Sequence, residues 1–218
     1  MTLQFNNRAG AGEILAGKLA KFAGNPSGLV LALPRGGVPV AHAVAKRLGL
    51  PLDVFIVRKL GVPGHEELAM GAIASGGVCF TNDRLIASLH IPENAVAAVR
   101  AKEQLELERR EHQYRPGRRE LSVRGRTVIL VDDGIATGAS MRAAALALRK
   151  ADAGRIVLAV PVAAPAARRE LADVSDEFVA VLQPEDFQGV GQWYNDFTQV
   201  TDGEVTNLLQ DSAADASG

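Results

Sequence analysis

The sequence predicts an α/β protein built on a parallel β-sheet, and three observations support this fold class. Apolar runs that are too short for helices recur along the chain, as at residues 29–33 and 128–131. Segments in which apolar residues have helical spacing separate these runs, which is typical of strands joined by crossover helices. Of the 218 residues, 47% are hydrophobic, which is enough for one domain with an additional segment.

The predicted elements alternate along the chain. Ile14, Leu15 and Leu19 recur at helical spacing, and Gly24-Asn25-Pro26 ends this first helix, expected over residues 10–23. The remaining core elements are expected as strand 29–33, helix 38–48, strand 52–57, strand 127–131, helix 140–151, strand 156–160, helix 165–172 and strand 178–182. Residues 1–80 and 120–182 therefore form the predicted α/β core.

Residues 81–119 lie between the two halves of this core, and the sheet does not need them. Helix-forming residues with interleaved Lys, Glu and Arg over 92–114 predict one long helix or two. Such an insert is a solvated brace, a dimer surface or a roof over the active site. After the last strand we expect residues 183–210 to form a hood and a final helix, and the small, polar residues 211–218 to be a disordered tail.

The most informative segment is the strand at 127–131, which ends in Asp132 and Asp133 and continues into a turn of small residues, 134–140. Ligands bind at the carboxyl ends of strands in open parallel sheets, and backbone N–H groups ahead of a helix suit a phosphate. The two carboxylates would repel a phosphate, so we expect them to accept hydrogen bonds from ribose hydroxyls. The segment therefore predicts a site for ribose 5-phosphate.

Two other phosphate motifs are excluded. A Walker A loop requires G-x-x-x-x-G-K-[ST], which does not occur in the chain. A dinucleotide fold requires G-x-G-x-x-G after its first strand, and residues 34–39, Pro-Arg-Gly-Gly-Val-Pro, do not supply it.

Residues 128–140, Val-Ile-Leu-Val-Asp-Asp-Gly-Ile-Ala-Thr-Gly-Ala-Ser, resemble the phosphoribosyl diphosphate (PRPP) signature of type I phosphoribosyltransferases. The resemblance extends over residues 5–194 to predicted phosphoribosyltransferases with a helical insert. It implies the type I fold, a Rossmann-like core with a helical insert and a small C-terminal hood. It also implies PRPP contacts at Asp132, Asp133, Gly134, Ile135, Ala136, Thr137, Gly138, Ala139 and Ser140.

Two further segments are expected to bind the diphosphate of PRPP. Arg35-Gly36-Gly37 follows the first strand, and its glycines let the backbone approach an anion beside a guanidinium. This segment resembles the family's diphosphate loop, where a non-proline cis peptide is common, here at Arg35-Gly36 or its neighbour. Arg58 and Lys59 follow the second strand and alternate in direction. The resemblance favours Lys59 on the diphosphate and Arg58 as a structural or dimer-crossing residue.

Residues 61–73 are expected to begin as a mobile loop rich in Gly and Pro and to continue as a strand. In this fold such a loop closes over PRPP and excludes water from an oxocarbenium-like transition state. Glu66 or Glu67 would stabilise that cation or act on the nucleophile; otherwise they are solvated. The predicted catalytic residues are Asp132, Asp133, Lys59 and Glu67.

Acceptor recognition is expected in the hood, where aromatic faces suit a planar heterocycle. Phe187, Trp193 and Tyr194 are the candidates. The alternative is a hydrophobic plug that anchors the helix expected over residues 202–209.

The predicted reaction transfers the ribose 5-phosphate group of PRPP to a nitrogen acceptor, a nucleobase or a related heterocycle, and releases diphosphate. Mg2+ would bind mainly through PRPP, without a dedicated protein site. The alternative is a non-catalytic regulatory protein that binds PRPP or a nucleotide. A net charge of -1 argues against nucleic acid as an obligate partner. Because no signal pattern or long apolar stretch is visible, we expect a cytoplasmic protein without membrane contact, and the resemblance implies a homodimer.

Overall fold

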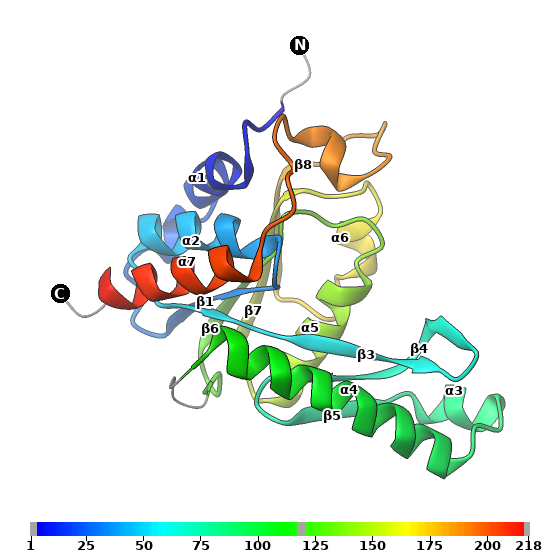
Figure 1. Ribbon diagram of the computed structural model, residues 1–218. Coiled ribbons are helices and arrows are strands. Elements are labelled where there is room, and N and C mark those ends of the chain that lie inside the picture. The colour runs from blue at the N-terminus through cyan, green and yellow to red at the C-terminus, as the bar shows by residue number, and fades with distance from the viewer. Residues whose placement is uncertain (1–3, 117–120, 216–218) are drawn as a thin grey trace.

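A parallel sheet of five strands, in the order β2-β1-β6-β7-β8, forms the centre of the protein (Figure 1). The structure is a computed structural model, and it describes residues 4–116 and 121–215. The strands of this sheet are β1 Gly28–Ala32, β2 Leu52–Val54, β6 Thr127–Val131, β7 Arg155–Val162 and β8 Glu177–Leu182. The predicted parallel sheet is therefore confirmed, and β6 has the predicted bounds.

Helices cover both faces of this sheet (Figure 1). The helices are α1 Arg8–Lys18, α2 Gly37–Leu48, α5 Ala139–Lys150, α6 Ala167–Glu170 and α7 Asp202–Asp215, with short 3-10 helices η1 Ala20–Phe22 and η2 Val190–Trp193. Strand β6 shows how the two faces divide: Ile129 and Val131 pack with α1, α2 and α7, whereas Val128 and Leu130 pack with α5. Because side chains on both faces are buried, the strands appear in the sequence as continuous apolar runs.

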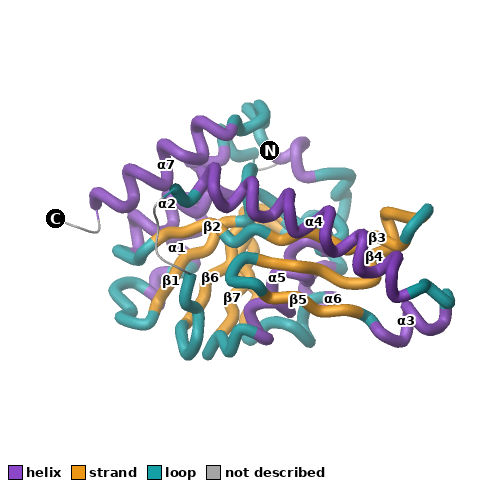
Figure 2. The backbone as a smooth tube through the Cα atoms, turned by 60° about the horizontal axis from the view of Figure 1, so that its bottom comes forward, coloured by secondary structure: helices purple, strands orange, loops and turns teal. Residues whose placement is uncertain are grey.

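A second sheet projects from the core and was not predicted (Figure 2). It is antiparallel and consists of β3 Val57–Val62, β4 His65–Ala74 and β5 Val78–Thr81. The expected strand 52–57 therefore ends at Val54, and the segment expected as a mobile loop is a β-hairpin with Gly64 in the left-handed region. The glycines that suggested a loop serve close strand pairing instead: a Cβ on Gly61 would lie 2.7 Å from the Glu66 carbonyl oxygen.

The insert contains two helices, α3 Asp83–Ser88 and α4 Glu93–Tyr114. Residues 92–114, expected to form one long helix or two, form the single helix α4, and α3 was not predicted. Helix α4 packs on the core through Leu107 and Tyr114, which are 1% and 3% exposed. Just after α4, Arg115 forms an ion pair with Asp53 of β2, with Nε 3.1 Å from Oδ1. The insert is therefore fixed to the core along one face of α4.

The C-terminal region corrects one prediction. Helix α7 continues to Asp215, so residues 211–215 are helical and the expected disordered tail is wrong for them; residues 216–218 lie outside the described part of the chain. The small Ala and Ser residues that suggested disorder are compatible with a helix. No helix in the described ranges has the length and apolar character needed to cross a membrane.

Candidate active site

The loop after β6 forms a cradle of backbone N–H groups. Within the described residues, the N–H groups of Ala136, Thr137 and Gly138 donate to no protein acceptor. Gly138 has a φ of 71° and turns the chain into α5, so the loop leads directly into a helix N-terminus. The loop, with Asp132 and Val190, lines a cavity of about 170 Å³. Free N–H groups at a helix N-terminus in a cavity of this kind suit an anion.

The two carboxylates at the end of β6 have different surroundings. Asp132 lines the cavity, and its Oδ1 accepts a hydrogen bond from the backbone N–H of Asp133 at 2.8 Å. Asp133 instead accepts a hydrogen bond from Arg8, with Nε 2.8 Å from Oδ2. Burial raises the pKa of both carboxyls; the charge of Asp133 raises the pKa of Asp132 further, whereas Arg8 opposes the rise for Asp133. Asp132 is therefore the carboxylate that faces the cavity.

Arg8 is a site residue that the sequence analysis missed. It is 9% exposed, donates from Nη1 to the carbonyl of Thr198 at 2.8 Å, and lies 3.9 Å from the ring centroid of Phe197. The side chain of Asn7 accepts from the N–H of Gly10 and caps α1, which places Arg8 in the first turn. The capping residue was visible in the sequence, but a partner 125 positions away was not.

The loop of Arg35, Gly36 and Gly37, which is the predicted diphosphate loop, lies directly against these carboxylates. A Cβ on Gly37 would lie 2.7 Å from the carbonyl oxygen of Val131 and 2.9 Å from Cα of Asp132, and a Cβ on Gly36 would overlap the carboxylate of Asp133. Glycine is therefore required at both positions for this approach. The peptide bond between Pro34 and Arg35 is cis, which confirms a cis peptide at the neighbour of Arg35-Gly36.

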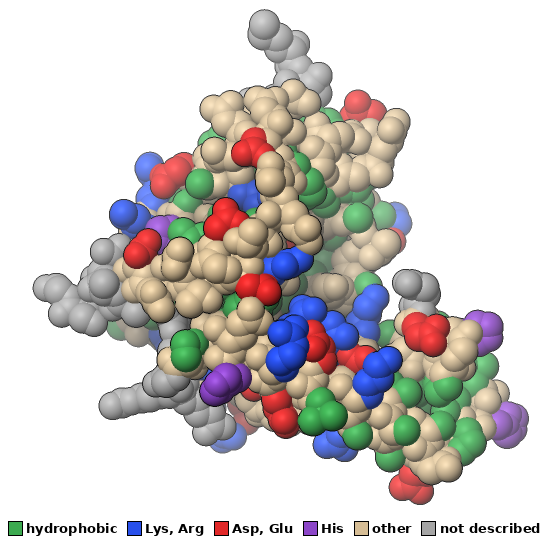
Figure 3. All heavy atoms as spheres, in the orientation of Figure 1, with side chains coloured by type: hydrophobic (Ala, Val, Ile, Leu, Met, Phe, Trp, Pro, Cys, Tyr) green, Lys and Arg blue, Asp and Glu red, His purple; other side chains and the backbone are tan. Residues whose placement is uncertain are grey.

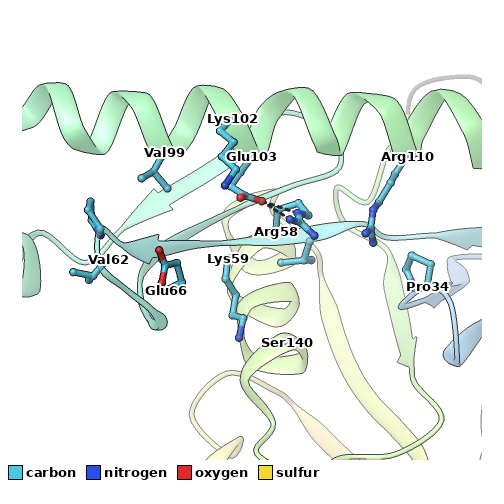
Figure 4. A pocket seen from close by; sticks show the side chains of 13 residues that line it. Pro34, Arg58, Lys59, Val62, Glu66, Val99, Lys102, Glu103, Arg110 and Ser140 are labelled. Atoms are coloured by element: carbon cyan, nitrogen blue, oxygen red, sulfur yellow. Dashed lines mark hydrogen bonds and ion pairs between the residues drawn. The ribbon is translucent and has the colours of Figure 1, made fainter.

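Arg58 and Lys59 lie on β3 and point in opposite directions, as the alternation predicts (Figure 4). Arg58 forms an ion pair with Glu103 of α4, with Nη2 2.6 Å from Oε2. Lys59 extends toward Ser140 at the start of α5 (Figure 4). Both line a cavity of about 480 Å³ between β3 and α4, to which Pro34 and Ser140 also contribute. Arg58 is therefore paired with the insert helix α4, whereas Lys59 faces the start of α5.

Helix α4 covers this larger cavity, so the insert is a roof over the candidate site, one of the arrangements left open by the sequence. Its contributions are Val99, Lys102, Glu103 and Arg110. Glu66 also lines the cavity, whereas the side chain of Glu67, which belongs to β4, lies outside what the structure describes. The predicted catalytic role of Glu67 stays a prediction.

The hood aromatics pack inward. Trp193 and Tyr194 are 3% and 5% exposed and form a core cluster with Phe5, and Phe187 packs at its edge. The Tyr194 hydroxyl donates to the carbonyl of Asp133 at 2.6 Å. This burial matches the plug alternative for Trp193 and Tyr194 and leaves their rings unavailable for stacking on an acceptor. The role predicted for Phe187 stays a prediction.

The sequence of this chain was compared with models of known protein families. A sequence model described as phosphoribosyl transferase domain matches residues 5–192. The chain belongs to the phosphoribosyltransferase family. The match spans the cradle, the diphosphate loop and β3, and together with the parallel sheet it confirms the predicted family and the type I fold.

Two curated proteins and one crystal structure that are similar to this phosphoribosyltransferase support the family assignment. Two curated proteins from Mycobacterium tuberculosis, strains CDC 1551 and H37Rv, each named "Putative phosphoribosyl transferase", are 46% identical over 205 residues. These matches cover 94% of this chain but 46% of each relative, so the chain spans about half of their length. The crystal structure of TT1426 from Thermus thermophilus is 42% identical, with a TM-score of 0.84 over 95% of this chain and 98% of that chain.

Proposed function

We propose that this phosphoribosyltransferase transfers the ribose 5-phosphate group of PRPP to a nitrogen acceptor, a nucleobase or a related heterocycle, and releases diphosphate. The observation that carries the proposal is the direct packing of two loops. Gly36 and Gly37 lie against Asp133 and Asp132, so the diphosphate loop and the cradle face one site. PRPP has a phosphate at one end of its ribose and a diphosphate at the other, and such paired loops suit that substrate.

Each group has a defined part in the proposed reaction. The N–H groups of residues 136–138 hold the 5-phosphate, and Asp132 accepts hydrogen bonds from the ribose hydroxyls. The acceptor nitrogen forms a bond to C1 of the ribose as the bond from C1 to the diphosphate oxygen breaks. Lys59 and the Arg35 loop stabilise the charge that develops on the leaving diphosphate. The raised pKa of Asp132 suits it to take the acceptor's proton, directly or through water.

Mg2+ fits this site as a partner of PRPP. Across residues 4–116 and 121–215 no group of three or more His, Cys, Asp or Glu side chains could hold a metal ion. Asp132 is a partly desolvated carboxylate beside the carboxylate of Asp133, and such a pair of negative charges favours a divalent cation nearby. When bound with PRPP, Mg2+ would neutralise charge on the departing diphosphate.

The test is acceptor-dependent release of diphosphate. The chain is incubated with Mg2+ and PRPP and a panel of purine, pyrimidine and other nitrogen heterocycles, and diphosphate is measured with and without each acceptor. The proposal predicts release with at least one acceptor, abolished in Asp132→Asn. If PRPP binds but no acceptor in the panel supports release, the result favours the regulatory alternative. A predicted homodimer is tested on the same sample by light scattering.

A further inference from the structure

A third cavity adjoins the diphosphate loop and is lined by arginines from two separate parts of the chain. It has a volume of about 200 Å³ and is lined by Pro34, Arg35, Arg109, Arg110, Tyr114 and Asp202. Lys and Arg side chains gather at the hollow on this face of the protein (Figure 3). Arg35 belongs to the diphosphate loop, whereas Arg109 and Arg110 belong to α4, so the insert brings positive charge to the site.

The arginines of α4 are held in place by one carboxylate. Glu106 accepts hydrogen bonds from Arg109, at 2.8 Å from Nε and 3.0 Å from Nη2, and from Nε of Arg110 at 2.7 Å. These hydrogen bonds lower the pKa of Glu106 to about 2, so it stays ionised at neutral pH. Arg109 also donates to Gln113. Glu106 therefore fixes the direction of both guanidinium groups.

Arg110 and Arg35 keep donors available for a ligand. Within the described ranges, the two terminal NH2 groups of Arg110 donate to no protein acceptor. The ion pair of Arg35 with Asp202 is long, with Nη1 3.6 Å from Oδ1, and Asp202 already accepts a hydrogen bond from the Tyr114 hydroxyl. Three guanidinium groups thus face the carboxylates of Glu106 and Asp202, which leaves one positive charge unbalanced.

Arg110 links this cavity to the larger one. It lines both, as does Pro34, and it extends from α4 toward Pro34 (Figure 4). An anion held by the diphosphate loop would therefore meet the free side of Arg110 at the boundary between the two cavities. Guanidinium groups bind phosphoryl oxygens in a fork geometry, which suits Arg110 and Arg35 to the same terminal phosphate.

We propose that the insert helix α4 supplies Arg110, together with Arg35, as a binding subsite for the outer phosphate of the diphosphate group. The inference rests on the proposed function and adds a residue from the insert to it. Glu106 acts as the positioning residue for Arg110. The insert is thereby part of the substrate site, rather than only a brace on the core.

The test compares Arg110→Gln with Arg100→Gln by calorimetry on the full chain. Arg100 is exposed on the same helix, ten residues earlier, and lines neither cavity. Three ligands are titrated separately into the wild type and into each variant: diphosphate with Mg2+, ribose 5-phosphate, and inorganic phosphate. Losing a hydrogen bond to a charged group predicts diphosphate binding about 10-fold weaker in Arg110→Gln. Ribose 5-phosphate binding should be unchanged, and Arg100→Gln should match the wild type.

The outcomes separate this inference from the proposed function. If the wild type binds ribose 5-phosphate and diphosphate, and Arg110→Gln binds both equally well, the subsite is overturned and the proposed function stands. If the wild type binds neither ligand, both are overturned. The third outcome concerns inorganic phosphate. If the wild type binds inorganic phosphate and diphosphate with equal affinity, and Arg110→Gln weakens the binding of both by the same factor, the site binds anions in general and its assignment to diphosphate is wrong. Equal thermal unfolding of the variants excludes misfolding as the cause.

Discussion

Replacing Arg8 with methionine should destabilise the protein severely, because it leaves Asp133 as a buried carboxylate without its cation. The side chains of Arg8 and Asp133 are only 10% and 15% exposed and lie 2.8 Å apart. Removing one partner of a buried ion pair costs about 3–5 kcal/mol in free energy of unfolding. In a chain of this size we expect a melting temperature lower by about 10 °C. Urea unfolding at pH 7 measures the loss directly.

The pH dependence and a double variant test the cause of this loss. Arg8 holds down the pKa of Asp133, which burial raises, so Arg8→Met should raise that pKa further. The native state then binds a proton more tightly than the unfolded state. The loss caused by Arg8→Met should therefore shrink as pH falls through the raised pKa. In an Asp133→Asn background, Arg8→Met should lower the free energy of unfolding by at least about 1 kcal/mol less than it does in the wild type. An equal cost of Arg8→Met in both backgrounds, with no pH dependence, would refute the reasoning.

Three further changes have defined outcomes. Gly37→Ala should weaken diphosphate binding at least about 10-fold in calorimetry, because the added Cβ would meet backbone atoms at the end of β6 that cannot move aside. The control is Gly17→Ala, which should bind diphosphate normally because its added Cβ would meet nothing within 4 Å. Asp132→Asn should raise the melting temperature at pH 7, because it removes a carboxylate whose pKa is raised by burial and by Asp133. This gain should vanish at low pH, where the carboxyl of the native protein is protonated. A gain in melting temperature that does not depend on pH would contradict the prediction. Lys59→Met should weaken PRPP binding about 10-fold without changing thermal unfolding, because Lys59 is exposed; Lys18→Met on α1 is the control, and equal PRPP affinity in both would remove Lys59 from the site.

The parallel core and the cradle could be predicted because their signals are local. The run 128–131 is apolar since both faces of β6 are covered, and Asp132 marks the end of that strand. The glycines at 36 and 37 were predicted to let the backbone approach an anion, and the structure shows that they also allow close packing against the end of β6.

The features that could not be predicted depend on contacts between segments that are distant in the sequence. Arg8 meets Asp133 across 125 positions, and Arg110 meets the diphosphate loop only because α4 folds back over β3. The second half of β4 was predicted as a strand, but the turn before it was taken for part of a mobile loop because Gly and Pro occupy it. Turn residues alone do not show whether the flanking segments pair. The burial of Trp193 likewise follows from its packing with Phe5, at the other end of the sequence.

Calorimetric titration of PRPP with Mg2+ into the wild type and into Asp132→Asn/Asp133→Asn is the most direct test of the proposed ribose 5-phosphate site. We expect saturable binding by the wild type, with one site per chain, and loss of that binding in the double variant while its far-ultraviolet circular dichroism is retained. Absence of PRPP binding by the folded wild type, or equal binding by both proteins, would contradict the assignment of the loop after β6 as the ribose 5-phosphate site.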